Sequence, residues 1–314
     1  MAIHYGMNKQ WDVAVAGEIF ADHVFSDFER WPEPGEEHFT DSYVREAGGG
    51  AAITSCALAR LGRSVALFGI AGEEDLWLMR RLHGFGVQSD GLRTTRTATA
   101  VSVSISTRSD RSFLTWPGAN RDLPAYLREQ KTQDRLSMAR HVHLAMPVDR
   151  GLALELIPRL RHAGCTISLD TGHQAEWLED QENRKTCGEV DFFMPNELEG
   201  QMVTGASDPV AMLAAFQAMG IWGVVLKLGP NGAIAPCSPE GICRGAAPAV
   251  TAVDSTGAGD AFDAGLIDAW LDRLPMSTML RRACVCGSLS TRSAGALASL
   301  PDREELNSYD VATR

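Results

Sequence analysis

Short apolar runs separated by segments with helical spacing constrain the fold of this chain more than any other feature. Six of these runs have strand length and are rich in β-branched residues: 11–17, 64–72, 141–145, 166–170, 191–196 and 223–229. Segments with helical spacing lie between most of them, for example residues 52–61 and 152–160. This alternation predicts an α/β fold built on a largely parallel sheet. Ligands of such sheets bind beyond the carboxyl ends of the strands, where three runs end at or near Asp170, Asn196 and Lys227.

One segment breaks this pattern. In residues 99–106 Val and Ile alternate with Ser, a polar turn follows, and the chain returns through residues 112–116. This spacing predicts an antiparallel hairpin with one half-exposed face. We expect two lid segments, roughly residues 22–46 and 96–117, to form a small sheet over the strand ends. The unpaired edges of such a lid make a homodimer through the lid an expectation.

Composition narrows the class of protein. The chain has 314 residues without a Pro/Ser-rich linker, which predicts a single domain over residues 1–314. A net charge of −11 without a dense Lys/Arg block argues against nucleic acid or an anionic membrane as partner. The seven cysteines are scattered and suggest reduced, buried thiols. With no export-like start and no apolar run of about 18 residues, we expect a cytoplasmic protein.

The segment DSTGAGDAFDAG, residues 254–265, carries the strongest chemical signal. Backbone amides around Gly257, Ala258 and Gly259 would be exposed where a helix begins, and the helix dipole favours an anion there. The carboxylate of Asp260 would repel that anion unless it removes a proton from a hydroxyl that attacks a phosphate. The alternative is an ordinary Gly-rich loop with a capping Asp.

This segment resembles the C-terminal signature of the ribokinase (PfkB) family of carbohydrate kinases. The resemblance implies a ribokinase-like three-layer sandwich around a mostly parallel sheet, with a small β-sheet lid. It also implies that Asp260 is the catalytic base and that Gly257, Ala258 and Gly259 belong to the anion hole. The chain has no Walker A sequence, so the phosphate would be bound by these amides.

The resemblance extends to the amino-terminal half. Residues 48–62 are similar to the family's N-terminal signature, in which Gly48 and Gly49 approach the sugar, and Asp22 matches the family's sugar-binding Asp. Asp22 could instead be a turn residue. Gly48 and Gly50 also fit a dinucleotide-binding turn, but Ile53 stands where its third Gly should be. The substrate site implied by the resemblance therefore comprises Asp22, the Gly48–Gly49 backbone and Asp260.

Two further motifs resemble the family's metal sites. Asn196 and Glu199 match its N-x-x-E motif, which implies that they organise the water shell of Mg²⁺ on the nucleotide. The same pair could be a helix capping box. Asp254 and the loop at residues 289–299 are similar to a monovalent-cation site of some relatives, where K⁺ would bind.

Residues 224–233 have the pattern of a strand, a turn and a second strand, which is similar to the family's ATP-binding segment. The resemblance implies that Lys227, Gly229 and Gly232 bind ATP together with Asn196, Glu199, Gly257 and Gly259. A lone Lys at a strand end is more often a solvated surface group.

Several residues differ from the family pattern where the molecule that accepts the phosphoryl group would bind. Ile53 replaces the signature Asn, Phe20 replaces a polar amide and Met146 replaces a Glu, so we expect a more apolar pocket and a substrate other than ribose. Gly172 and Gln174 replace the Asn and Arg of a D-x-N-x-R pattern. These changes leave phosphoryl transfer intact.

The resulting prediction is an ATP- and Mg²⁺-dependent kinase that phosphorylates a hydroxyl of a sugar or sugar derivative. The hydroxyl that we expect first is a primary alcohol. The alternatives are a nucleoside (adenosine-type) kinase and a catalytically silent sugar-binding regulator. Arg108 and Arg111 lie at the lid turn, where they could reach an acidic group of the substrate.

Overall fold

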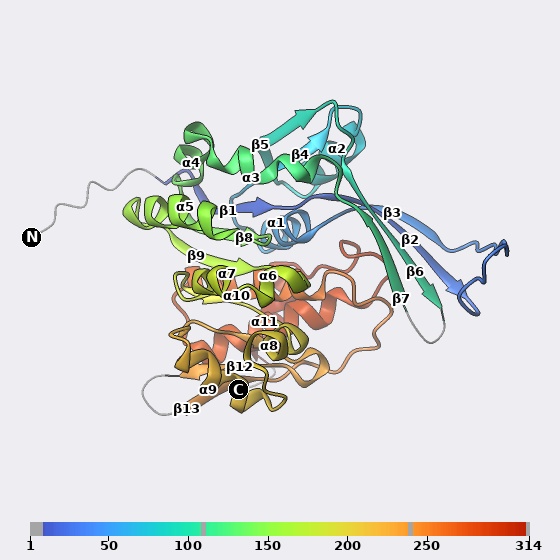
Figure 1. The fold of residues 1–314 in the computed structure, drawn as a ribbon. Coiled ribbons are helices and arrows are strands. Elements are labelled where there is room, and N and C mark those ends of the chain that lie inside the picture. The colour runs from blue at the N-terminus through green and yellow to red at the C-terminus, as the bar shows by residue number, and fades with distance from the viewer. Residues whose placement is uncertain (1–8, 108–110, 238–240, 312–314) are drawn as a thin grey trace, which may run out of the picture.

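The central sheet of the computed structural model is parallel. The model describes residues 9–107, 111–237 and 241–311. The strand order is β10-β9-β8-β1-β4-β5 (Figure 1). These strands are β1 (Trp11–Gly17), β4 (Val65–Gly72), β5 (Gln88–Thr95), β8 (Ala139–Ala145), β9 (Thr166–Asp170) and β10 (Phe192–Phe193). The predicted mostly parallel α/β sheet is confirmed.

Helices cover both faces of this sheet. The helices of the described residues are α1 (Gly50–Arg60), α2 (Leu76–Gly84), α3 (Leu123–Arg128), α4 (Gln130–Leu136), α5 (Arg150–His162), α6 (Ala175–Glu179), α7 (Gln181–Cys187), α8 (Glu197–Thr204), α9 (Pro209–Ala218), α10 (Ala258–Leu271), α11 (Met276–Ser290) and α12 (Arg303–Val311), with 3-10 turns at Gly118–Asp122 and Gly229–Asn231. Of these, α11 packs on α10, β12 and β13, and α12 packs on α11. Alternate residues of β1 enter opposite cores: Ala14 and Ala16 pack with α3 and α5, while Val13 and Val15 pack with α1 and α10. The fold is therefore a three-layer sandwich.

A separate four-stranded sheet forms the lid. Its order is β3-β2-β6-β7, with β2 (Phe20–Phe28), β3 (Tyr43–Gly48), β6 (Ala100–Thr107) and β7 (Arg111–Trp116), and it extends beyond the body in Figure 1. The predicted antiparallel hairpin is confirmed, because β6 pairs with β7 from Val101↔Trp116 to Ser106↔Arg111. The parallel pairing of β2 with β6 joins the two lid segments.

Two predicted strands are much shorter than expected. The runs at 191–196 and 223–229 contain only the two-residue strands β10 and β11 (Leu226–Lys227). Isolated parallel bridges, Phe193↔Val224 and Asn196↔Lys227, continue the pairing beyond them. The strand β5 was not predicted because its sequence QSDGLRTT is largely polar. Strands β11, β12 (Ala233–Cys237) and β13 (Gly241–Gly245) form a third, small sheet.

The prediction of reduced thiols is wrong for two of the seven cysteines. Cys237 and Cys243 form a disulfide, with their Cα atoms 5.5 Å apart. The antiparallel pairing of β12 with β13 brings them within bridging distance, and their separation in the sequence does not reveal this. The other cysteines are free and buried.

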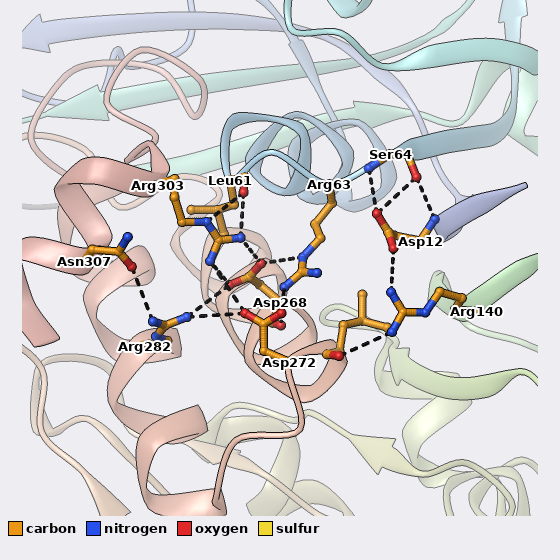
Figure 2. A network of polar contacts seen from close by, with 11 residues as sticks. Asp12, Leu61, Arg63, Ser64, Arg140, Asp268, Asp272, Arg282, Arg303 and Asn307 are labelled. Atoms are coloured by element: carbon orange, nitrogen blue, oxygen red, sulfur yellow. Dashed lines mark hydrogen bonds and ion pairs between the residues drawn. The ribbon is translucent and has the colours of Figure 1, made fainter.

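A network of arginines and aspartates joins α10, α11 and α12 to the segment just after α1 (Figure 2). The fully buried carboxylate of Asp268 in α10 accepts hydrogen bonds from Arg63 and Arg303 and lies 3.6 Å from the guanidinium of Arg282. Asp272, one turn later, pairs with Arg63 at 2.6 Å. In the part of the chain that the structure describes, no helix has the length and apolar character needed to cross a membrane.

Candidate active site

The turn before α10 leaves a helix N-terminus open. Gly257 adopts φ 74° and is the N-cap residue, and as a glycine it has no side chain to cap the first turn of this helix. A Cβ on Gly257 would lie 2.6 Å from the Cβ of Ala296 and 3.1 Å from the Ile53 side chain, so only glycine fits. The structure thus shows the amide-rich helix start that the sequence predicted.

Asp260 lies in the first turn of α10. Burial, reinforced by the nearby charges of Asp170 and Glu199, raises its pKa to about 7. A Cβ on Gly50, at the start of α1, would lie 3.0 Å from Asp260 Oδ1, so the carboxylate faces the first turn of α1. A carboxylate with this pKa can accept a proton near neutral pH.

The residues of the predicted substrate site come together where the lid strands β2 and β3 join the body, next to the start of α1. The carboxylate of Asp22, on β2, lies against Gly48, on β3, where a Cβ would collide with it. Burial, together with the charges of Asp260 and Glu46, raises the pKa of Asp22 to about 7. Gly49 adopts φ 87°, and a Cβ there would meet the Phe20 ring at 2.9 Å. The structure thus gathers Asp22, Gly48, Gly49 and Asp260 in one region.

Two of the three expected apolar positions lie in this region. Phe20 packs against Gly49, and the buried Ile53 contacts Gly257. Met146 follows β8 and is buried in the core cluster that contains Ala14. Its neighbour Ala145 lies close to the start of α1, with its Cβ 3.4 Å from a Cβ position on Gly50.

Lys227 is not a solvated surface group. Its Nζ lies 2.5 Å from Asp170 Oδ2 and 3.2 Å from Asp263 Oδ1, and its side chain is only 11% exposed. A Cβ on Gly259 would lie 3.4 Å from the same Nζ, so the ammonium stands beside the start of α10. Sequence reasoning did not single out Asp263. The available signal was its spacing of three residues from Asp260, which places both on one helix face.

Asn196 and Glu199 form a capping box at the start of α8. Asn196 Oδ1 accepts from the Glu199 backbone N–H at 2.9 Å, and Glu199 Oε2 accepts from the Asn196 backbone N–H at 2.9 Å. The structural alternative from the sequence is therefore confirmed. Burial and the nearby charge of Asp170 raise the pKa of Glu199 to about 7, so this acid faces the same cluster as Lys227.

The remaining predicted residues lie in turns. Gly229 (φ 56°) and Gly232 (φ 87°) bound the turn between β11 and β12, where a Cβ on Gly232 would collide with a backbone carbonyl. Asp254 accepts hydrogen bonds from the backbone N–H groups of Thr256 and Gly295, both at 2.9 Å, and so joins the loop before α10 to the loop after α11.

Of the two arginines predicted at the lid turn, Arg108 lies outside the described residues, and so does the side chain of Arg111.

Comparisons with known proteins identify the fold and the family of this chain. The 2-dehydro-3-deoxygluconokinase of Bacillus subtilis (strain 168) is 26% identical over 300 residues, which cover 90% of this chain and 92% of that protein. The structure of Arabidopsis thaliana ribokinase complexed with ribose and ATP has a TM-score of 0.83 at 24% identity, covering 95% of this chain and 98% of that one. A ribokinase II of E. coli in complex with ATP and Mg²⁺ has a TM-score of 0.80 at 22% identity, covering 96% and 99%. The model of the pfkB family carbohydrate kinases matches residues 11–303. The chain therefore belongs to the pfkB family of carbohydrate kinases, enzymes that transfer a phosphoryl group to an alcohol.

Proposed function

We propose that this protein is an ATP-dependent kinase that phosphorylates a hydroxyl, in particular a primary alcohol, of a sugar or sugar derivative, with Asp260 as general base. The observation that carries the proposal is the position of Asp260. Its carboxylate stands at an open helix N-terminus, near Asp22, and its raised pKa suits proton transfer. The matched structure, complexed with ribose and ATP, supports a sugar or sugar derivative and ATP as the ligands of this chain.

Each group then has a task. Asp22 and the backbone of Gly48 and Gly49 hold the acceptor, and Asp260 removes the proton from its hydroxyl. The amides of residues 257–259 stabilise the negative charge on the transferred phosphoryl group, and Lys227 adds a positive charge beside them. Gly229, Gly232 and Asn196 bind the remainder of ATP. Closure of the lid excludes water that would otherwise hydrolyse ATP.

Mg²⁺ would be held near Glu199 through its bound waters. The fit rests on Glu199 itself, a buried acid with a raised pKa in a cluster that is short of positive charge. Bound there, the ion would neutralise phosphate charge. At Asp254 we propose a monovalent cation, K⁺ or a similar ion, because this acid joins the two loops that match the family's cation site.

Two other functions are possible on the same fold: a nucleoside kinase and a catalytically silent sugar-binding regulator. A nucleoside kinase would use Asp260 as the base in the same way, but would bind a nucleoside, which is larger than a sugar. A silent sugar-binding regulator would not need a base, so the raised pKa of Asp260 beside the open helix start favours an enzyme. Release of ADP in the presence of a sugar or a nucleoside separates the three functions.

Ribose is expected to be a poor substrate. Phe20 and Ile53 cannot hydrogen-bond sugar hydroxyls, and each unpaired buried hydroxyl costs about 1–3 kcal/mol, so kcat/KM for ribose should fall at least about tenfold below that for the best acceptor. The measurement is ADP release with ribose, fructose, a deoxy sugar acid, a phosphosugar and adenosine. Ribose as the best of this set would contradict the argument.

Glu199→Gln is expected to raise the Mg²⁺ concentration for half-maximal rate by about tenfold, because a neutral amide orients metal-bound waters less well than a carboxylate. Gln can still cap α8, so the midpoint of thermal unfolding should change little. The Mg²⁺ dependence of ADP release measures the effect. An unchanged Mg²⁺ dependence would leave Glu199 with a structural role alone.

We also propose that residues 1–314 form a single kinase domain that acts in the cytoplasm, where ATP is abundant, as a homodimer through the lid. One lid face presents the exposed side chains of Tyr43, Leu114 and Trp116. The strand register places all three on the same face, and a second copy would cover them. The molar mass of the protein in solution checks the dimer.

A further inference from the structure

Lys227 is held by two acids that come from different layers of the fold. Asp170 ends β9, Asp263 lies in the second turn of α10, and Lys227 ends β11. The side chain of Asp263 is fully buried, and those of Asp170 and Lys227 are 12% and 11% exposed. The ammonium therefore has two fixed partners in a region nearly closed to water.

Carboxylate oxygens of Asp170, Asp263 and Asp260 lie within 4.8 Å of one another, beside the one ammonium of Lys227. Buried carboxylates this close do not all ionise, so one of the two acids that hold Lys227 carries a proton. Asp263 is the more deeply buried, and burial raises its pKa well above its usual range. Burial acts in the same direction on Asp170, but the ammonium of Lys227, 2.5 Å away, holds the pKa of Asp170 below its usual range. Asp263 is therefore the neutral acid, and Asp170 is the ionised partner of Lys227.

This assignment leaves one side of the ammonium available. Two of its protons point to Asp170 and Asp263, and the Cβ position of Gly259 lies 3.4 Å from Nζ. We propose that Asp263 is a positioning residue: it donates a hydrogen bond to Asp170, accepts one from Lys227, and so holds the ammonium toward the start of α10. This inference rests on the proposed function, which places the transferred phosphate there.

The surrounding charges explain why a neutral acid suits this position. Asp260 on α10 and Glu199 on α8 face the same cluster, and the charges of Asp170 and Lys227 act on His143 of β8. His143 adds no positive charge, because burial lowers its pKa to about 4. An ionised Asp263 would place another carboxylate beside a single ammonium. Its proton limits the excess of negative charge where the triphosphate must bind.

Asp263→Asn and Asp263→Leu test the role. The amide can donate to Asp170 and accept from Lys227 as the neutral acid does, and Leu can do neither. Calorimetric titration without an acceptor measures the affinity for ATP and, as a control, for AMP, which lacks the β- and γ-phosphates. We expect Asp263→Asn to keep ATP affinity within about threefold of wild type, and Asp263→Leu to lose about tenfold or more. AMP affinity should change less than about threefold in both variants.

The pH dependence supplies a second readout. Wild-type affinity for ATP should weaken as the pH rises and Asp263 loses its proton. Asp263→Asn should show a smaller loss, because an amide does not ionise and only Asp260 and Glu199 still gain charge. This comparison also decides the matter if Asp263→Leu fails to fold. Equal damage in both variants, equal loss of ATP and AMP, unimpaired ATP binding by Asp263→Leu, or an unchanged alkaline loss in Asp263→Asn would each overturn the proposal. Because no acceptor is present, these outcomes do not depend on whether Asp260 is the base.

Discussion

Asp260→Asn is expected to lower kcat by about 10²–10⁴-fold, because the amide keeps the shape of the carboxylate but cannot accept the proton of the attacking hydroxyl. Affinity for ATP should remain near that of wild type, since the amides at residues 257–259 and the ammonium of Lys227 are unchanged. Initial rates of ADP release give kcat, and titration without an acceptor gives the dissociation constant for ATP. The substitution thus separates chemistry from nucleotide binding.

The same assignment predicts how the wild-type rate depends on pH. A base works only when it is ionised, and burial together with Asp170 raises the pKa of Asp260 to about 7. The value of kcat/KM for the acceptor should therefore fall as the pH drops below about 7 and level off above it.

An Asp260→Asn variant that keeps more than about a third of the wild-type turnover would contradict the role of Asp260. So would a loss of ATP affinity as large as the loss of rate.

Local features of the fold and site followed from the sequence. The runs at 11–17 and 166–170 are strands with the predicted bounds, and the Gly-Ala-Gly segment opens a helix as its composition indicated. The signal in each case lies within a few consecutive residues, so periodicity and glycine content suffice to detect it.

Features that depend on contacts between distant segments were not predicted. Asp170, Lys227 and Asp263 meet only because β9, β11 and α10 converge, and no local pattern marks Asp263 as their third member. The bridge between Cys237 and Cys243 likewise needs the pairing of β12 with β13.

The second large effect is expected in stability rather than in rate. Asp268 is fully buried, and its carboxylate accepts hydrogen bonds from Arg63 and Arg303 and faces Arg282 (Figure 2). These contacts join α10 to the chain after α1, to α11 and to α12. Asp268→Ala would leave three guanidinium groups around a cavity without their buried counter-charge, and loss of one partner from such a pair costs about 3–5 kcal/mol.

Asp272 provides the matched control, because its side chain is 40% exposed and pairs with Arg63 in the same network. Asp272→Ala should cost no more than about 1 kcal/mol, since the lost carboxylate is well exposed and Arg63 keeps its hydrogen bond to Asp268. Denaturant unfolding, followed by circular dichroism, measures the free energy of unfolding of both variants. Equal losses would show that the burial of Asp268 does not set its contribution. Two helical turns separate Asp268 from Asp260, so folded Asp268→Ala should retain most of its kcat at low temperature, and a selective loss of kcat would instead assign this network a role in aligning α10 for catalysis.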